Sequence, residues 1–280
     1  MSWRMRVVHT TGYVYDAPVM RSFNEARLTP RADSRQNVIL NRVETVPSTR
    51  SYRYVDYWGT TVTAFDLHAP HTELEVTGSS VVETEPFASP EEELPWERLR
   101  SEPVVDRYDE LLTATGYVPR DRRLGTVARQ LTRGVAPAKA VVRAAEWVHR
   151  EMSYLAGTTS VHTSAVEAFA ERRGVCQDYA HLTLLLLRGM GIPSRYVSGY
   201  LHPDPAGAVG RTVAGQMHAW VEAWTGQWWG YDPTNNIPVT EQHVAIGVGR
   251  DYADVPPLKG IFSGSGSTDL EVVVEITRLA

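Results

Sequence analysis

Residues 174–201 read GVCQDYAHLTLLLLRGMGIPSRYVSGYL, and this stretch decides the fold. Its Leu-rich middle, Leu182–Leu187, predicts a helix that is buried on most sides. Glycine and proline within 189–193 predict that this helix ends near residue 190. The last part, Arg195–Leu201, contains valine and two tyrosines and predicts a strand. We therefore expect a central helix that begins at Cys176 and is followed by a strand.

The segments around this helix indicate an α+β protein. From Trp3 to about Val82, short alternating segments rich in Val, Tyr, Thr and Phe predict β-strands that pack as a small antiparallel sheet or sandwich. The Pro- and Glu-rich segment FASPEEELP, residues 87–95, predicts a domain boundary. We expect a β-rich domain over 1–86 and a core with a helical lead-in over 87–280. In the core, helices are predicted near 104–112, 122–131, 138–152 and 164–171, and strands over 195–201, 216–224, 228–232 and 270–277.

Composition and charge argue against nucleic acid and membranes as partners. The formal net charge is −5 and the pI is near 6.0. Binding of nucleic acid needs a concentrated basic surface, so no nucleic-acid partner is expected. The N-terminus, MSWRMRVVHT, lacks the continuous apolar stretch of a signal peptide. No apolar run approaches the roughly 20 residues that cross a bilayer. We therefore expect no membrane contact and, by default, a cytoplasmic location.

Cys176 is the single cysteine of the chain, so neither an intramolecular disulfide nor a multi-cysteine metal site is expected. Its predicted position is the N-terminus of the central helix. Free N–H groups and the helix dipole favour an anion there, which lowers the pKa of a thiol. Gly174 permits a close backbone approach just before it. On position alone, a reactive thiol and an inert core cysteine remain equally open readings.

Residues 216–233 read QMHAWVEAWTGQWWGYDP and predict a β-hairpin that turns at residues 225–227. If the loop is centred on residue 225, His218 faces Asp232 directly; if it is centred on residue 226, Asp232 is a diagonal neighbour. Both registers place the two side chains on one face, whereas a two-residue loop would separate them. A carboxylate beside an imidazole favours its protonated form, so the pair can serve a thiol as base. The alternative is an ordinary buried histidine and an aspartate that caps a turn.

The segments GVCQDYAHLTLLLLRGMGIPSRYVSGYL, MHAWVEAW and WWGYDPTNN resemble the Cys, His and Asp boxes of the transglutaminase-like superfamily of papain-like cysteine enzymes. The β-rich first 85 residues resemble the N-terminal domain that accompanies this core in bacterial members. The resemblance implies Cys176 as nucleophile, His218 as general base and acid, and Asp232 as the third member of a triad. It also implies a papain-like fold in which the cysteine helix packs on an antiparallel sheet.

Three further residues are weaker candidates for the site. Gln177 follows the cysteine, and its backbone N–H could join that of Cys176 in an oxyanion hole. His181 lies about 140° around the helix from Cys176, which favours a place in the core or a supporting contact. Tyr179 can equally be a packing residue. No H-E-x-x-H pair or comparable ligand spacing occurs, so neither a metal nor an organic cofactor is expected.

The expected reaction is acyl transfer on a peptide or protein substrate. A thiolate attacks a peptide or carboxamide carbonyl, and the resulting thioester is opened by water or by an amine. Hydrolysis, as in a protease or amidase, is the favoured reading. Protein-glutamine transglutaminase is the alternative, and a catalytically inactive binding module of the same fold is the reading from a different class.

Overall fold

The computed structural model describes residues 2–87, 94–264 and 268–280, so most of the predicted boundary segment lies outside it. The predicted central helix is confirmed as α7 (Cys176–Met190). It ends at Gly191, whose φ of +81° is left-handed, as is typical of a helix C-terminus. The leucines of its middle are buried in the largest apolar core of the molecule.

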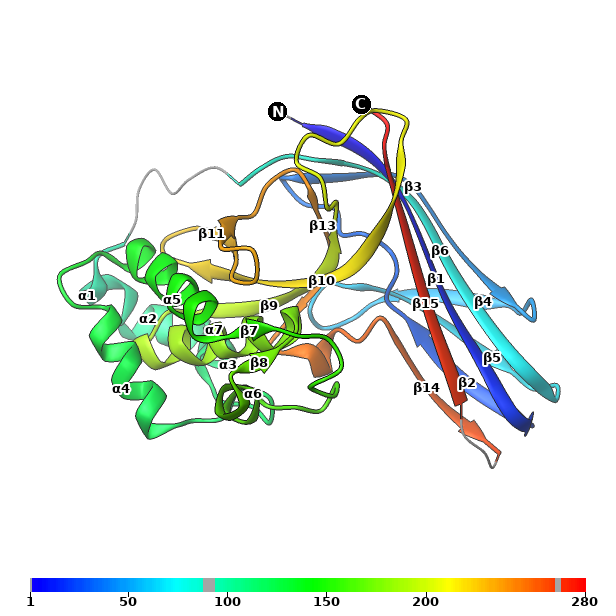
Figure 1. The fold of residues 1–280 in the computed structure, drawn as a ribbon, viewed down its shortest axis with the longest axis horizontal. Coiled ribbons are helices and arrows are strands. Elements are labelled where there is room, and N and C mark those ends of the chain that lie inside the picture. Colours follow the sequence, from blue (N-terminus) through cyan, green and yellow to red (C-terminus); the bar gives the residue numbers. More distant parts are fainter. Residues whose placement is uncertain (1, 88–93, 265–267) are drawn as a thin grey trace.

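Three helices pack on α7 and complete the helical side of the core: α4 (Arg122–Leu131), α5 (Pro137–Glu151) and α6 (Ala165–Glu171). The helix predicted near 104–112 is divided at Tyr108 into α2 (Glu102–Arg107) and α3 (Asp109–Leu112), and α1 (Trp96–Leu99) precedes them. The remaining short elements are the parallel pair β7 (Ser153–Tyr154) and β8 (Arg173–Gly174) and the 3-10 helix η1 (Tyr252–Asp254). Figure 1 shows the helices gathered at one end of the molecule and the long strands at the other.

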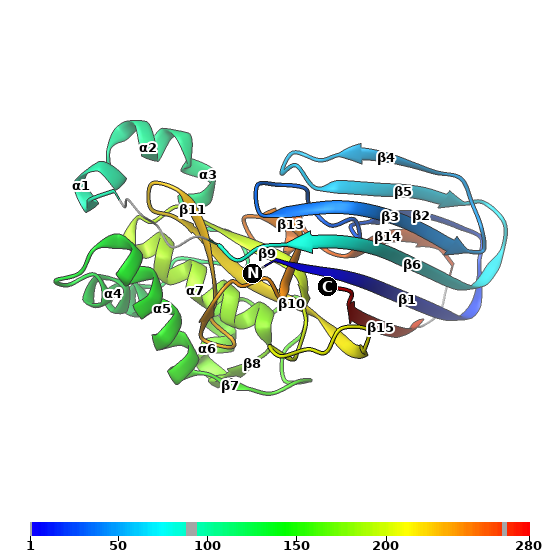
Figure 2. The same ribbon diagram turned by 90° about the horizontal axis from the view of Figure 1, so that it is seen from above.

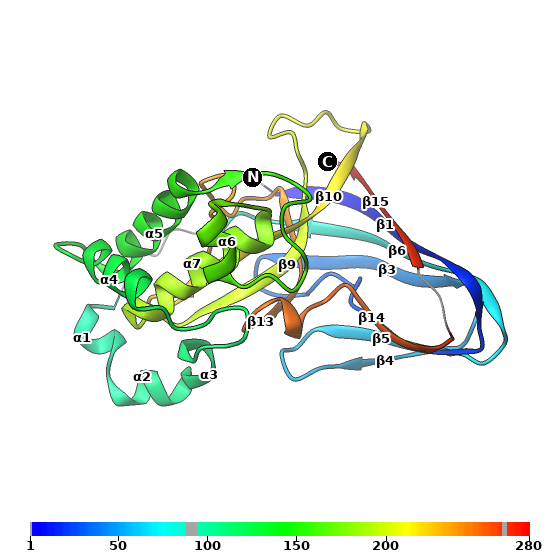
Figure 3. The same ribbon diagram turned by 60° about the horizontal axis from the view of Figure 1, so that its bottom comes forward.

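The strand-rich end is a sandwich of two antiparallel layers. One layer contains β1 (Trp3–Val19), β3 (Gln36–Val46), β6 (His71–Thr84) and β15 (Thr268–Arg278). The other contains β2 (Arg21–Ala26), β4 (Ser51–Val55), β5 (Thr61–Leu67) and β14 (Leu258–Ser263). Figure 3 shows the two layers, and apolar side chains such as Leu28, Phe65 and Leu74 fill the space between them. The sandwich predicted from the alternating segments is therefore present.

A second group of strands lies between the sandwich and the helices. These are β9 (Ser194–Leu201), β10 (Thr212–Trp224), β11 (Trp228–Asp232), β12 (Ile237–Pro238) and β13 (His243–Gly249). The long strand β10 connects both parts. Residues 212–215 pair with β15, whereas residues 216–223 pair with β9, against which α7 packs. Figure 2 shows β9 and β10 beside α7, with the sandwich beyond them.

The expected α+β class, with a cysteine helix on an antiparallel sheet, is confirmed. The division at residue 86 stays a prediction. Strand pairing adds that β14 and β15, which follow the core in the sequence, pair with β2 and β1 of the sandwich. Within the part of the chain that the structure describes, no helix combines the length and apolarity needed to cross a membrane.

The buried leucines of α7 should carry much of the stability. Replacing Leu186, which has no exposed surface, with alanine is expected to lower the free energy of unfolding by about 2–5 kcal/mol, because the deletion leaves a cavity. Leu155→Ala is the control, because that side chain is 46% exposed and should cost less than about 0.5 kcal/mol. Denaturant unfolding of both variants measures the difference. Equal losses would show that the helix is not tightly packed.

Candidate active site

Cys176 is the first residue of α7, as expected. The N–H groups of a first helical turn have no intrahelical acceptor, so those of Cys176 and Gln177 remain able to bind an anion. Asp178 closes the turn. Its carboxylate accepts hydrogen bonds from the Val175 N–H and the Thr159 hydroxyl, both at 2.8 Å. Cys176 itself is only partly buried, so its sulfur lies at the boundary between core and solvent.

The side chain of Asp178 packs directly against the backbone of Gly174, which is the close approach expected from the sequence. A Cβ atom at residue 174 would collide with the carboxylate and the Cβ of Asp178. The glycine therefore allows Asp178 to reach back to the Val175 N–H and fix the start of the helix.

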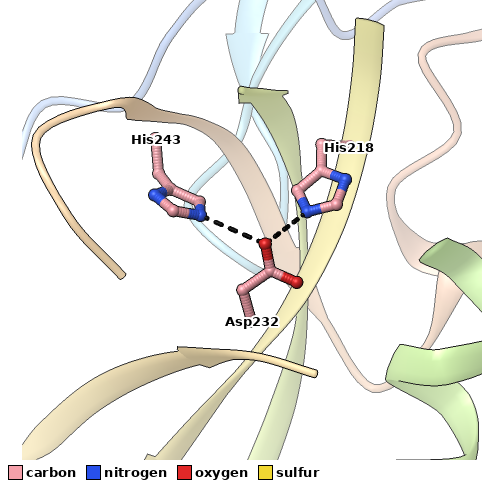
Figure 4. A group of neighbouring side chains, drawn as sticks. All are labelled: His218, Asp232 and His243. Atoms are coloured by element: carbon pink, nitrogen blue, oxygen red, sulfur yellow. Dashed lines mark hydrogen bonds and ion pairs between the residues drawn. The ribbon is translucent and has the colours of Figure 1, made fainter. Parts of the chain in front are cut away.

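His218 and Asp232 are joined by a hydrogen bond. Trp224 pairs with Trp228, so the hairpin is centred on Gly226 and the diagonal register is the one adopted. Gly226 has a φ of +118°, which favours glycine at the centre of the turn. His218 Nε2 lies 2.7 Å from Asp232 Oδ2, and Figure 4 shows this contact. This distance is typical of a charge-assisted hydrogen bond.

Asp232 has no exposed surface, and donors surround its carboxylate. Oδ1 accepts from the backbone N–H groups of Thr234 and Asn235, at 2.9 and 3.2 Å. Oδ2 accepts from the Asn235 amide at 2.7 Å, in addition to His218. Burial would raise the pKa of Asp232, but hydrogen bonds from His218 and His243 and the positive charge of His218 hold that pKa far below its usual range. Asp232 is therefore a carboxylate at any pH of interest.

His218 has partners on both sides of its ring. Burial favours the neutral imidazole, but hydrogen bonds to Asp232 and to Cys176, and the negative charges of both groups, raise the pKa of His218 to about 10. Because Nε2 binds Asp232, Nδ1 is the nitrogen left for the thiol. His218 of β10 thus contacts Asp232 at the end of β11 directly, and Cys176 of α7 contributes to the raised pKa of His218.

A second histidine that the sequence did not single out contacts the same carboxylate. His243, at the start of β13, is fully buried, and its Nε2 lies 3.4 Å from Asp232 Oδ2 (Figure 4). No spacing rule could have found it, because its position depends on the pairing of β13 with β9. The segment HVAIGVG contains two glycines and was not predicted as a strand.

His218, Asp232 and His243 also present ligand atoms of the kind that zinc prefers, all within 4.8 Å of one another. In a tetrahedral site, ligands about 2.1 Å from zinc lie roughly 3.4 Å apart. The 2.7 Å between His218 Nε2 and Asp232 Oδ2 is shorter, as expected for a shared proton. These three residues therefore form a hydrogen-bonded network, and an ion would have to separate them and displace their protons.

Comparison with known proteins agrees with this architecture. Residues 125–233 match the model of the transglutaminase-like superfamily, and residues 5–83 match the bacterial transglutaminase-like N-terminal region. An uncharacterized protein of Mycobacterium leprae is 62% identical over 278 residues, which cover 99% of this chain and 100% of that one. The chain belongs to the transglutaminase-like superfamily.

Two further relatives show how far the likeness to the superfamily extends. A solved structure from Cytophaga hutchinsonii, described as a "putative cysteine protease", superposes with a TM-score of 0.79 at 22% identity and covers 100% of this chain and 92% of that one, which shows a shared fold. A protein-glutamine gamma-glutamyltransferase of Pseudomonas aeruginosa is 32% identical over 127 residues, which cover 42% of this chain and 19% of that protein.

The three weaker candidates lie close to the cysteine of this transglutaminase-like core but have structural contacts. The Gln177 side chain donates to the Val161 carbonyl at 3.2 Å. His181 is fully buried, accepts from the Tyr252 N–H at 3.2 Å, and has a pKa lowered to about 3 by burial and by the charge of Arg188. Tyr179 is buried in the main core. His181 and Tyr179 thus lie in the core, and an oxyanion role for the Gln177 N–H stays a prediction.

A cleft of about 380 Å³ adjoins the site. His218 lines it, together with side chains that carry no formal charge: Tyr154, Leu201, Pro203, Ala214, Gln216, Thr234 and Asn235. Burial, and the negative charge of the Cys176 thiolate, raise the pKa of Tyr154. The cleft therefore reaches His218 and suits an uncharged group.

The charge on His218 should depend on the thiol. In Cys176→Ala, the pKa of His218 is expected to fall below its wild-type value of about 10, because one hydrogen bond and one negative charge are removed. Titration of the histidine ring signals by NMR measures this, and His68, an exposed residue, serves as internal reference. An unchanged His218 titration would show that the thiol and the imidazole do not interact.

Gly174 should tolerate no side chain. Gly174→Ala is expected to lower the free energy of unfolding by about 1–3 kcal/mol, because its Cβ displaces Asp178 from the start of α7. Gly116→Ala is the matched control, since a Cβ there meets nothing within 4 Å. Denaturant unfolding compares the two variants. Equal stability of the two would contradict the close approach of Asp178.

Proposed function

We propose that this protein is a cysteine-dependent acyl-transfer enzyme that hydrolyses peptide or carboxamide bonds, with Cys176, His218 and Asp232 as its catalytic residues. The observation that carries the proposal is the position of His218. Its imidazole lies between a fully buried carboxylate and a thiol at a helix N-terminus, and its pKa is raised to about 10. An imidazolium beside a thiol stabilises the thiolate, which is the nucleophilic form.

The mechanism follows from these positions. The Cys176 thiolate attacks the carbonyl carbon, and the electron pair of the C=O bond moves to oxygen. The N–H groups at the start of α7 supply hydrogen bonds to that oxyanion. His218 then donates its proton to the departing amine or ammonia, and a thioester remains. Water, deprotonated by His218, attacks the thioester and releases the acid and the thiol.

An amine acceptor in place of water would make the same site a transglutaminase. The likeness to the glutamyltransferase of Pseudomonas aeruginosa over 42% of this chain supports this second candidate. Because the adjoining cleft is lined without a formal charge except on His218, a neutral carboxamide such as a glutamine side chain suits either reaction. The expected partner is thus a peptide or protein, and the expected location remains the cytoplasm.

Thiol reactivity tests the Cys–His pair without a known substrate. Alkylation of Cys176 by iodoacetamide, followed by mass spectrometry from pH 5 to 9, should be fast below pH 7 in the wild type. In His218→Ala it should follow the reference thiol pKa of about 8.5. His68→Ala is the control and should retain the wild-type profile. Slow labelling in both wild type and His218→Ala would contradict the enzyme proposal and favour a non-catalytic binding module.

The acceptor is tested with a glutamine-containing peptide, with and without cadaverine. Both reactions release ammonia when the thioester forms. A hydrolase then converts glutamine to glutamate, whereas a transglutaminase joins the amine, so the peptide gains the mass of cadaverine less that of the ammonia released. Cys176→Ala should abolish both reactions. Cleavage of the peptide backbone in place of either would identify a protease, and product formation by Cys176→Ala would refute thiol catalysis.

A further inference from the structure

His243 is the first residue of β13, which pairs with β9 on the side opposite β10. It pairs with Leu201 of β9, while His218 of β10 pairs with Gly199 of the same strand, so the two histidines approach Asp232 from opposite sides of β9. Their ring centroids are 6.2 Å apart. The ring of Trp220 packs edge-on against His243 at 5.2 Å, which leaves His243 no exposed surface.

The hydrogen bonds of His243 determine which ring nitrogen carries the proton. The backbone N–H of Thr240 points to His243 Nδ1 at 3.1 Å. A backbone N–H can only donate, so Nδ1 must be the acceptor and the proton of the neutral ring must be on Nε2. That nitrogen faces Asp232 Oδ2. His243 is therefore oriented as a donor to the carboxylate.

The surroundings of His243 keep its ring neutral. Burial lowers the pKa of His243, and the positive charges of His218 and Arg35 act in the same direction, against the opposing effect of Asp232. A neutral donor restrains a carboxylate without cancelling its charge. If His243 were an imidazolium, Asp232 would be shared between two cations, and its stabilisation of protonated His218 would be weaker.

We propose that His243 is a positioning residue of the thiol site: as a neutral imidazole protonated on Nε2, it holds the Asp232 carboxylate toward His218 and leaves its full charge to that histidine. This inference rests on the proposed function, because it assigns His243 a part in the same acyl transfer. His243 touches neither the substrate cleft nor the sulfur among the contacts of the described residues, so it acts through Asp232.

The wild-type protein offers the first test. Long-range proton–nitrogen NMR at pH 7.5 should find His243 neutral, with a protonated Nε2 and a bare Nδ1, while His218 is protonated at the same pH. A protonated Nδ1 on His243 would overturn the proposal. This measurement needs no variant and no substrate.

Variants then test the consequence for the thiol. In His243→Leu, the donor is lost and Asp232 is held less well toward His218. The rate of Cys176 alkylation at pH 6 should fall by roughly tenfold, which corresponds to about 1.4 kcal/mol of lost stabilisation of the thiolate–imidazolium pair. His243→Gln retains an N–H donor and should recover most of that rate. His9→Leu is the matched control, since His9 is equally buried but bonds Tyr200 and Thr11. It should retain the wild-type pH profile whatever its loss of stability.

The outcomes separate the two proposals. A folded His243→Leu protein with the wild-type alkylation profile would overturn the role of His243 and leave the acyl-transfer proposal intact. If instead wild-type alkylation is indifferent to His218→Ala, the acyl-transfer proposal fails. The pKa of His218 measured by NMR in His243→Leu then still decides whether His243 acts on the pair, because a fall in that pKa supports the proposal and an unchanged value overturns it.

Discussion

The charge of Asp232 is the constraint on which the rest of the site depends. Removing a carboxylate from water costs several kcal/mol unless donors replace the lost hydration. Here the donors come from β10, from β13 and from the turn that follows β11. All three segments must be in place for the carboxylate to have its full set of hydrogen-bond donors. The His218–Asp232 pair therefore depends on the assembled sheet.

The other half of the site depends on the apolar core. The buried leucines of α7 fix the helix against α4, α5 and β10, and this packing determines where its N-terminus lies. Gly174 and Asp178 then fix the first turn. The thiol at this helix end and the imidazole on β10 are thus carried by two elements that pack on each other. Loop flexibility is not needed to bring them together.

Local patterns were enough to predict most elements. α7 and α4 have the predicted bounds, because buried leucines and helix-ending residues occur within the same few turns. The hairpin was less determined. Loops centred on Thr225 and Gly226 are both compatible with the sequence, and only the observed pairing of Trp224 with Trp228 shows which register is adopted.

What the sequence did not reveal depends on contacts between distant segments. His243 reaches Asp232 only because β13 joins β9, and β14 and β15 return to the sandwich after the core is complete. Nothing in the local composition of these segments specifies the partner strand. The order Cys176, His218, Asp232 could be predicted from the resemblance, whereas the contact of His243 with the carboxylate could be found only from the structure.

Because β10 runs without a break from the sandwich to the candidate site, the sandwich affects the position of His218 without contacting it. Residues 212–215 are held in phase by β15, and His218 follows only three residues later on the same strand. Side chains of a strand alternate between its two faces, so a slip of one residue in that distant pairing would turn the imidazole away from the helix. The pairing with β15 therefore sets which way His218 faces, and insertions or deletions within residues 212–215 should be far less tolerated than substitutions there.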